Sequence, residues 1–331
     1  MIFVDNEHNT KPYINLAIEE HLMRNLATDE DILLFYINEP SIIIGKHQNT
    51  LEEINLEYVQ SHNIHVTRRL SGGGAVYHDL GNLNFSFITE NRPENVHNFR
   101  KFTEPVVRAL QTLGVPAEVG GRNDILADGR KISGNAQYIS GKRMVSHGTL
   151  LFNTDMSELS RALNVKPGKI QSKGIKSVQS RVANISEFLA APMDTETFRT
   201  HLLHEILERS ESIPQYHLTP ADWEAINALS LSRYQTWDWN YGRSPEFNVQ
   251  KTNRFPGGEV DARIDVHDGI IKCIRFYGDF FSQKEPSELE ARLVGVRYEA
   301  AALTAALAGV EVSEFFHSVD NEAFVNFLYY A

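Results

Sequence analysis

The sequence predicts an α+β protein whose main sheet is mixed or largely antiparallel. Short runs of β-forming residues are joined by tight turns, and the Asp128-Gly129 pair is a strong hairpin signal. Apolar spacing predicts an amphipathic helix over Phe99–Leu113, which Gly114 and Pro116 end. Strands joined by tight turns and interspersed with helices are typical of the α+β class. At 331 residues, the chain is long enough for about two domains.

The first half of the chain is expected to mix helices with short strands. Helices are predicted over Ile14–Leu26 and Leu51–Gln60, where apolar residues recur at helical spacing. Extended chain is predicted from Ala75 to Ile88. The remaining β-rich runs predict strands over Ile32–Ile37, Ser41–Gly45, Ile64–Thr67, Ile125–Ala127, Lys131–Ile139 and Met144–Phe152.

The second half is expected to be helical and then to form a smaller α+β unit. From Asp155 the pattern is helical, most clearly over Thr195–Glu208. Gly242-Arg243-Ser244-Pro245 is the best linker candidate, so we expect a larger domain over residues 1–245 and an accessory domain over 250–331. In the tail we expect a hairpin of Glu259–Val266 and Ile270–Phe276, followed by helices over Ser287–Leu293 and Arg297–Leu307.

Composition and charge exclude several classes of function. The net charge is −11 and the chain has no long block of lysine and arginine, which argues against general nucleic-acid binding. The sequence contains no run of about eighteen apolar residues, so no membrane span is predicted. The single cysteine, Cys273, excludes an intramolecular disulfide, and the N-terminus does not resemble a signal peptide. We therefore expect a cytoplasmic protein.

The segment from Arg68 to Asp79 contains two arginines, a serine and three consecutive glycines. Glycines cost backbone entropy and offer no side chain to pack, so three beside a strand indicate a backbone that a ligand must approach. Arginine forks suit phosphates and carboxylates. A flexible turn would also explain the glycines, but the local charge favours an anion-binding loop. The loop is neither a P-loop, which needs a lysine after its glycines, nor a dinucleotide fingerprint, which opens a helix.

A second glycine-flanked basic segment covers residues 129–135. Strand alternation predicts one face with Lys131, Ser133, Asn135 and Gln137, and an opposite face with Arg130, Ile132 and Gly134. A solvated hairpin face would give the same pattern. Together with the glycine loop, however, Lys131 favours a phosphate site, because a lysine there can neutralise charge that develops in a transition state.

Other features allow two interpretations. The basic segment Ser172–Val182 predicts either an ordinary surface loop or a lid that closes on an anion. His147 is either a pocket residue or a structural histidine. The histidine pairs at 62/65 and 201/204 have no further ligand nearby in sequence, which argues against zinc. Cys273 lies in an apolar strand pattern without adjacent basic residues, which favours a small core residue over a nucleophile.

Five motifs, in their order and spacing, resemble the lipoate–protein ligase family. They occupy residues 68–84 (Arg-Arg-x-Ser-Gly-Gly-Gly-Ala-Val-Tyr-His-Asp-x-Gly-Asn-x-Asn), 121–124 (Gly-Arg-Asn-Asp), 131–136 (Lys-Ile-Ser-Gly-Asn-Ala), 147–151 (His-Gly-Thr-Leu-Leu) and 173–182 (Lys-Gly-Ile-Lys-Ser-Val-Gln-Ser-Arg-Val). The similarity runs from about residue 15 through Trp-Asp-Trp-Asn at 237–240, and the tail resembles the accessory domain of two-domain bacterial members. The resemblance implies a catalytic domain of the biotin/lipoate-ligase type, an α+β fold related to class II aminoacyl-tRNA synthetase cores.

The resemblance also implies a two-step reaction. ATP and lipoate would first give lipoyl-AMP and pyrophosphate, with Mg²⁺. The ε-amine of a lysine on a lipoyl domain would then attack the mixed anhydride and form an amide, with AMP as a good leaving group. The implied acceptors are the acyltransferase subunits of 2-oxoacid dehydrogenase complexes and the glycine-cleavage H protein.

The family's site residues carry over by position. Lys131 would be the catalytic residue, bridging the lipoyl carbonyl and the α-phosphate. ATP and lipoyl-AMP would be bound by it and by Arg69, Ser71, Gly72, Gly73, Gly74, Ala75, Val76 and Tyr77. The lipoate pocket would be lined by Leu16, Glu19, His78 and His147. The adenylate loop would span about residues 167–182, with Lys173, Lys176, Ser177 and Arg181, which supports the lid interpretation. Asp124 would be a carboxylate that positions magnesium or the amine.

Two other functions stay open. An octanoyl or lipoyl transferase of the same fold makes a thioester on a cysteine, but Cys273 lies far along the chain from every motif. A non-catalytic lipoate-binding protein would have no need of Lys131, because a charge required only in the transition state is not required for binding. A biotin–protein ligase is disfavoured because Arg-Arg-x-Ser-Gly-Gly-Gly replaces its Gly-Arg-Gly-Arg-x-Gly type of loop.

Overall fold

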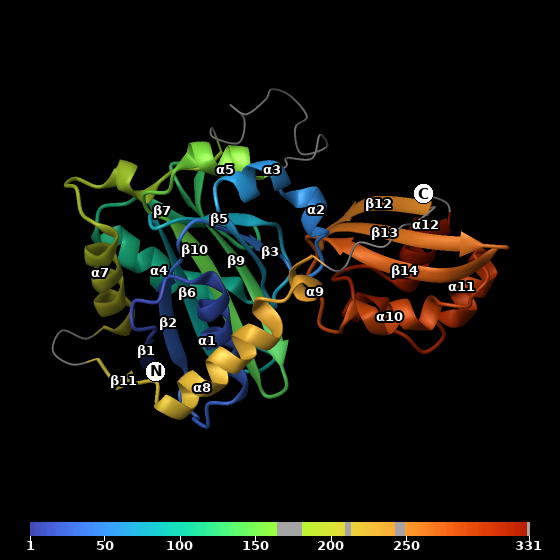
Figure 1. Cartoon of the computed structure of the whole chain (residues 1–331), viewed down its shortest axis with the longest axis horizontal. Coiled ribbons are helices and arrows are strands. Elements are labelled where there is room, and N and C mark those ends of the chain that lie inside the picture. Colours follow the sequence, from blue (N-terminus) through green and yellow to red (C-terminus); the bar gives the residue numbers. More distant parts are fainter. Residues whose placement is uncertain (164–180, 209–212, 242–248, 330–331) are drawn as a thin grey trace. The chain divides into compact units, whose positions relative to one another are not determined.

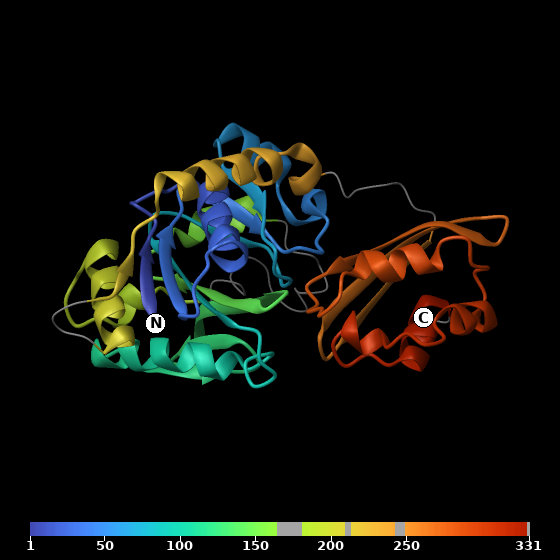
Figure 2. The same cartoon turned by 90° about the horizontal axis from the view of Figure 1, so that it is seen from below.

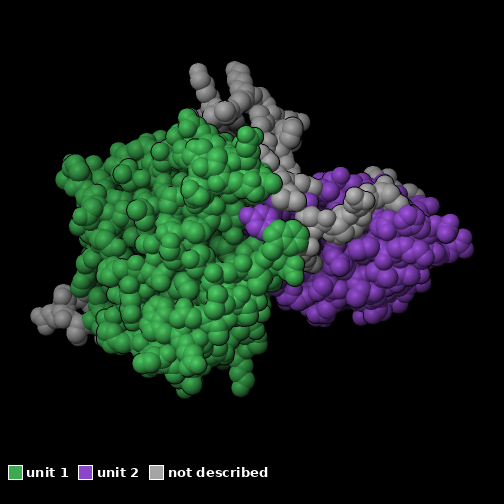
Figure 3. Space-filling model, in the orientation of Figure 1, with its two compact units in different colours: residues 1–43, 52–68, 76–240 green, residues 44–51, 69–75, 241–331 purple. Residues whose placement is uncertain are grey.

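A computed structural model of the protein describes residues 1–163, 181–208, 213–241 and 249–329. The chain divides into two compact units, which Figure 3 distinguishes by colour. The first unit contains Met1–Ile43, Glu52–Arg68 and Val76–Asn240, and the second contains Ile44–Leu51, Arg69–Ala75 and Tyr241–Ala331. The glycine loop therefore belongs to the second unit. The linker predicted at residues 242–245 lies outside the described residues.

The first unit is built on an eight-stranded mixed sheet in the order β11-β1-β2-β6-β10-β9-β8-β7. β1 pairs in parallel with β2 and β11, and the pairs from β2 through β7 are antiparallel. The prediction of an α+β fold with a mixed sheet is confirmed. The strands are β1 (Ile2–Asp5), β2 (Ile32–Ile37), β6 (Asn82–Glu90), β7 (Ala117–Gly120), β8 (Asp124–Ala127), β9 (Arg130–Ser140), β10 (Arg143–Leu151) and β11 (Gln215–Tyr216).

Helices cover both faces of this sheet (Figures 1 and 2). On one face, α4 (Phe99–Thr112) and α7 (Thr195–Leu207) pack on a core that includes Phe35, Phe85 and Phe87. On the other face lie α1 (Pro12–Arg24) and α8 (Pro220–Leu229), which continues into the π-helical turn η3 (Ser230–Tyr234). The second face combines buried apolar residues, such as Leu34 and Ile88, with buried polar ones, such as Ser86.

A smaller three-stranded sheet carries the two ends of the glycine loop. Its order is β4 (His65–Arg68), β3 (Ser41–Ile44) and β5 (Val76–His78). The single helix predicted over Leu51–Gln60 is two short helices, α2 (Thr50–Glu53) and α3 (Leu56–Ser61). The reason is Asn55, whose side chain accepts a hydrogen bond from the Tyr58 amide and so starts a new helix.

The C-terminal part of the second unit is a three-stranded antiparallel sheet with helices. Its strands are β12 (Val249–Phe255), β13 (Gly258–His267) and β14 (Ile270–Gly278), and its helices are α10 (Pro286–Leu293), α11 (Ala300–Ala306) and α12 (Asn321–Tyr329). The predicted hairpin is confirmed as β13–β14. The prediction of a core Cys273 is wrong, because the register shifts between Asp265 and Val266 and Cys273 is half-buried opposite Asp265.

Candidate functional site

Lys131 stands at a β-bulge. Opposite β8, the register moves from Ile125–Ser133 to Leu126–Lys131, so Ile132 is an extra residue in β9. The predicted face shared by Lys131 and Ser133 is therefore wrong. A Cβ atom added to Gly134 would lie 3.0 Å from Lys131 Nζ, so the lysine side chain crosses Gly134. The bulge turns Lys131 to the face of the sheet opposite the phenylalanine core.

The ammonium group of Lys131 is paired with Asp124. Lys131 Nζ lies 2.8 Å from Asp124 Oδ1, and the two side chains are 41% and 33% exposed. Asp124 is directly opposite Gly134 in the β8–β9 ladder, which brings the carboxylate to the same face. Both groups thus remain accessible to a substrate while the acid orients the lysine.

The backbone of Lys131 is fixed by the end of the predicted adenylate loop and by the residue that follows it. The Lys131 amide donates to the Arg181 carbonyl at 2.7 Å, and the Ala183 amide donates to the Lys131 carbonyl at 3.0 Å. The exposed Arg181 is thus tied directly to the strand of the lysine. The other predicted loop residues, Lys173, Lys176 and Ser177, lie outside the described residues.

A buried acid–imidazole pair lies further along the same face. His147 is opposite Ala136 in β9 and opposite Ser86 in β6, so its side chain projects on the same side as that of Ala136. Glu19, on α1, accepts a short hydrogen bond from Ser86 Oγ and lies 2.9 Å from His147 Nδ1. Both members of the pair are less than 10% exposed. Leu16, one turn earlier on α1, is also buried.

Strand geometry relates this pair to the lysine. Lys131 Nζ stands over Gly134, and His147 is level with Ala136, two residues further along β9. At about 3.3 Å per residue, the two positions are separated by about 7 Å along the strand. Only a hydrogen atom and a methyl group project from β9 at these two positions. The sequence motifs at 131–136 and 147–151 are therefore brought together on one face.

His78 is buried in a chain of amide side chains. Its Nδ1 lies 3.0 Å from Asn38 Nδ2, Asn38 Oδ1 accepts from Asn15 Nδ2 at 2.8 Å, and Asn15 Oδ1 accepts from Asn6 Nδ2 at 2.8 Å. These contacts tie β5 to β2 and α1. Sequence reasoning did not single out Asn15, Asn38 or Ser86, although polar residues within buried apolar elements were an available signal.

Arg69 shapes the glycine loop from inside. Its Nη2 donates to the carbonyls of Gly72 and Gly74 at 2.7 and 2.9 Å, and its Nε donates to Ser71 Oγ at 3.0 Å. Gly73 has φ +96°, and an added Cβ there would lie 2.9 Å from Arg69 Nη2. At Gly74, in contrast, an added Cβ would meet nothing within 4 Å. The backbone at Gly74, whose carbonyl Arg69 holds, therefore has open space on the side where a Cβ would project.

Close approaches of other backbone segments explain why residues 72 and 45 are glycines. An added Cβ on Gly72 would lie 2.3 Å from the Phe280 carbonyl oxygen, and one on Gly45 would lie 1.9 Å from the Gly73 carbonyl oxygen. The Phe280 ring stacks on His47 at 4.6 Å. Residues near Phe280 thus support the loop within the second unit.

The end of the loop enters β5. Val76 pairs with Ile43, and Tyr77, which follows Ala75 and Val76, pairs with Ile42 and is buried. Burial, with the charge of Asp79 as a smaller cause, raises the pKa of the Tyr77 phenol well above its usual value. Tyr77 therefore stays neutral and packs through its ring.

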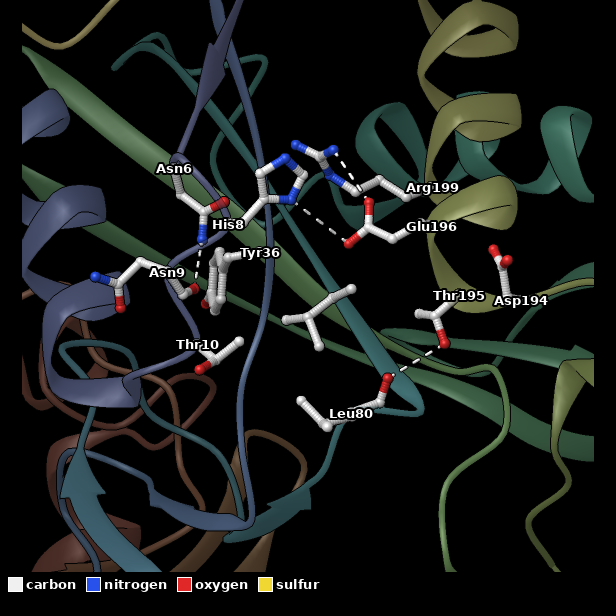
Figure 4. Close-up of a pocket in the computed structure, with 11 residues that line it drawn as sticks. Asn6, His8, Asn9, Thr10, Tyr36, Leu80, Asp194, Thr195, Glu196 and Arg199 are labelled. Atoms are coloured by element: carbon white, nitrogen blue, oxygen red, sulfur yellow. Dashed lines mark hydrogen bonds and ion pairs between the residues drawn. The ribbon is translucent and has the colours of Figure 1, made fainter.

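A separate pocket of about 460 Å³ lies in the first unit (Figure 4). Its walls include Asn6, His8, Tyr36, Leu80 and Arg199, and none of the residues predicted from sequence lines it. Arg199 is held by Asp5 at 3.3 Å and by Glu196 at 3.4 Å. Its ion-pair partners in the described residues are thus acidic side chains of the protein itself.

The residues that the structure describes contain no group of three or more His, Cys, Asp and Glu side chains that could hold a metal ion. A single carboxylate such as Asp124 suits Mg²⁺ only where substrate phosphates provide further ligands. Among the same residues, no helix has the length and apolar character needed to span a membrane.

Comparison with known proteins agrees with this geometry. The family model of the lipoyl protein ligase A/B catalytic domain matches residues 11–207, and that of the bacterial lipoate protein ligase C-terminus matches residues 244–328. The chain is 53% identical to lipoate-protein ligase LplJ of Bacillus subtilis, covering 99% of this chain and 100% of that protein. It is 48% identical to lipoate–protein ligase 1 of Staphylococcus aureus, with the same coverage.

Solved structures give the same result. The structure of P. falciparum LipL1 in complex with lipoate has a TM-score of 0.76 at 26% identity, covering 94% of each chain. A lipoate-protein ligase A bound with ATP has a TM-score of 0.60 at 30% identity, covering 73% of this chain and 97% of that chain. With two family models and near-complete relatives in agreement, the chain belongs to the lipoate–protein ligase family and is an enzyme of that type.

Proposed function

We propose that this ligase activates lipoate as lipoyl-AMP and transfers the lipoyl group to a lysine of a lipoyl domain. The observation that carries the proposal is the shared face of the sheet. Lys131 stands at its accessible end, and the buried Glu19–His147 pair lies about 7 Å further along the strand. That spacing suits a carboxylate at the lysine and a pentanoyl chain that runs toward His147, with the dithiolane ring at the buried end.

Lys131 would act in the activation step. The lipoate carboxylate attacks the α-phosphorus of ATP, the new C–O–P bond forms, and pyrophosphate leaves with the electron pair of the broken P–O bond. Negative charge grows on the α-phosphate oxygens during this step, and a preorganised ammonium group stabilises it. The 2.8 Å contact with Asp124 supports this role, because it orients the ammonium group before substrates bind.

The glycine loop would bind the phosphate side of ATP and lipoyl-AMP. The open backbone at Gly74 supports this role, since a ligand can approach where an added Cβ would meet nothing. Arg69 would act mainly by holding the loop carbonyls of Gly72 and Gly74. The segment around Arg181, which is tied to the backbone of Lys131, would couple the adenylate loop to the lysine.

Asp124 fits a magnesium ion that ATP brings to the site. Mg²⁺ is commonly held by one or two carboxylates plus substrate phosphates, and Asp124 is one-third exposed beside the lysine. The ion would neutralise charge on the leaving pyrophosphate. After activation, Asp124 is also the carboxylate available to orient an incoming amine beside the mixed anhydride.

The acceptors would be lipoyl domains of 2-oxoacid dehydrogenase complexes or the glycine-cleavage H protein. One similar solved structure is from a study of a bi-partite archaeal lipoate protein ligase and its E2 lipoyl domain. It is 32% identical over 75% of this chain, with a TM-score of 0.64. The transferase alternative is disfavoured because Cys273, the chain's single cysteine, is half-buried in β14, far along the chain from every motif. The non-catalytic alternative is disfavoured by the accessible Lys131.

The test is a complete reaction with purified components. The protein, ATP, Mg²⁺ and lipoate are incubated with an unmodified lipoyl domain, and the acceptor is examined by mass spectrometry. The proposal predicts the mass of one lipoyl amide on one lysine, dependent on ATP and absent from a lysine-to-arginine acceptor. Binding of lipoate without any modification of several lipoyl domains and H protein would favour the non-catalytic alternative.

A further inference from the structure

The Trp-Asp-Trp-Asn segment at residues 237–240 has no role in the proposed chemistry, yet it encloses a fully buried arginine. Arg68 is 1% exposed. Its Nε donates to the Trp239 carbonyl at 2.9 Å, its Nη2 donates to the Asn240 carbonyl at 3.2 Å, and its amide donates to Asn240 Oδ1 at 2.9 Å. In return, Trp239 Nε1 donates to the Arg68 carbonyl at 2.8 Å. Four hydrogen bonds therefore fix the last residue of β4.

This anchor stands where the glycine loop begins. Arg68 ends β4, and the next residue is Arg69, whose guanidinium holds the loop carbonyls. Burying a charged side chain costs desolvation free energy unless the side chain is fully hydrogen-bonded. Packing alone therefore does not explain a buried arginine at this position. Through the peptide bond, the hydrogen bonds on Arg68 fix the residue from which the loop starts.

The same segment also holds α1. Tyr234 is buried in the π-helical turn that precedes Trp239, and its carbonyl accepts from Thr67 Oγ1 at 3.2 Å and from Asn240 Nδ2 at 2.8 Å. Its hydroxyl donates to Glu20 Oε2 at 2.8 Å. π-helical turns occur frequently at functional sites. Tyr234 thus joins β4 to α1.

Glu20 is the neighbour of Glu19 in α1. It is 2% exposed, and Arg233 Nη1 and Arg24 Nε both contact its Oε1. Arg233 also stacks over the Trp239 ring, 5.3 Å from its centroid. Because Glu19 and Glu20 are adjacent in one helix, a partner that holds Glu20 also holds the helix that presents Glu19 to His147.

We propose that residues 233–240 are a positioning element that serves both substrates, with Trp239 acting on the glycine loop through Arg68 and Tyr234 acting on the lipoate end of the site through Glu20. The inference rests on the proposed function, because it takes ATP and lipoate as the ligands. It assigns neither Trp239 nor Tyr234 any contact with a substrate. The two arms are separable, since each includes a hydrogen bond from a different side chain, Trp239 Nε1 to the Arg68 carbonyl and the Tyr234 hydroxyl to Glu20.

The test uses two conservative substitutions, each of which removes one hydrogen bond and keeps an aromatic ring. Trp239→Phe weakens the loop arm and Tyr234→Phe weakens the α1 arm. Dissociation constants for α,β-methylene-ATP and for lipoate are measured by calorimetry. Losing one buried hydrogen bond corresponds to about a three- to tenfold change. We expect Trp239→Phe to weaken the nucleotide more than lipoate, and Tyr234→Phe to weaken lipoate more than the nucleotide.

Matched controls separate positioning from general destabilisation. Trp223→Phe also removes an indole hydrogen bond, from Nε1 to Glu7 Oε1 at 3.1 Å, and should leave both constants unchanged. Arg24→Gln removes a contact to Glu20 that comes from within α1 itself. Arg233→Gln removes a contact to Glu20 that comes from η3, and it should reproduce the effect of Tyr234→Phe. Arg233→Gln also serves if Tyr234→Phe does not fold.

The outcomes distinguish the inference from the proposed function. If the wild-type protein binds neither lipoate nor the nucleotide, the proposed function fails. If the wild type binds both and the folded variants lower only the melting temperature, the positioning role is wrong. Equal weakening of both ligands in both variants would also overturn the inference, because it assigns one ligand to each arm.

Discussion

Lys131 Nζ and Asp124 Oδ1 lie 2.8 Å apart on neighbouring strands, beside the one-residue bulge at Ile132. Without the bulge, strand alternation would direct the lysine toward the phenylalanine core. The bulge therefore decides whether this lysine can reach a substrate. The Lys131 side chain and the apolar core under α4 and α7 lie on opposite faces of the sheet.

Lys131→Ala should leave the fold intact and slow the formation of lipoyl-AMP. Loss of a preorganised charge of this kind costs about 10²–10³ in rate. The measurement is acid-quenched single turnover with labelled ATP. Arg130→Ala is the matched control, because the adjacent arginine pairs with Glu187 at a partly exposed position and should change the rate little. A wild-type rate in folded Lys131→Ala would remove the lysine from the mechanism.

Gly73→Ala and Gly74→Ala should behave differently. Gly73 has φ +96° and crowds Arg69, so alanine there adds strain of about 1–2 kcal/mol and should lower the melting temperature. Gly74 is open, so alanine should leave stability unchanged but weaken binding of a non-hydrolysable lipoyl-adenylate analogue. Calorimetry and thermal melts of both variants make the comparison. Unchanged affinity in Gly74→Ala would mean that the ligand does not approach this backbone.

Cys273→Ser should leave ligation at the wild-type rate. The cysteine is half-buried on β14, and the proposed reaction needs no thioester. The check is the initial rate of acceptor lipoylation, together with mass spectrometry of the enzyme after incubation with ATP and lipoate. An acyl group on Cys273 and a loss of transfer in the serine variant would instead support the transferase alternative.

Asp222→Asn should reduce stability in a pH-dependent way. Burial alone would raise the pKa of Asp222, but hydrogen bonds from Thr219, His21 and Tyr216 hold it well below its usual value. A depressed folded-state pKa gives stability that is present above about pH 4 and is lost as the pH falls toward the folded-state value. We expect a loss of about 1–3 kcal/mol at neutral pH. Urea unfolding from pH 7 to pH 2.5 should show the two proteins converging at low pH, and a constant difference would contradict this assignment.

Much of the fold was predictable because the spacing of apolar residues and the positions of turn residues indicate the same elements. The helix at 99–113, the Asp128-Gly129 hairpin and the β13–β14 hairpin all combine apolar spacing with clear turn residues. β12 was not predicted, since Val249–Phe255 is largely polar and exposed, and its strand structure depends on pairing with β13. Local sequence carries no signal of such a tertiary partner.

Two wrong strand predictions have a common physical cause. Lys131 was placed on one face with Ser133, and Cys273 was placed in the core, and in both cases one extra residue interrupts the ladder. A period of two cannot reveal a bulge, because the bulge is set by pairing with the next strand. The roles of Arg68 and Tyr234 were missed for a related reason, since their partners lie far along the chain.

The most direct measurement of the central claim is lipoate-dependent exchange of labelled pyrophosphate into ATP. Exchange requires reversible formation of lipoyl-AMP and needs no acceptor protein, so it isolates the step assigned to Lys131. The account predicts exchange with wild-type protein, ATP, Mg²⁺ and lipoate, none without lipoate, and a loss of about 10²–10³ in Lys131→Ala. Lipoate binding without exchange, or equal exchange in wild type and Lys131→Ala, would contradict it.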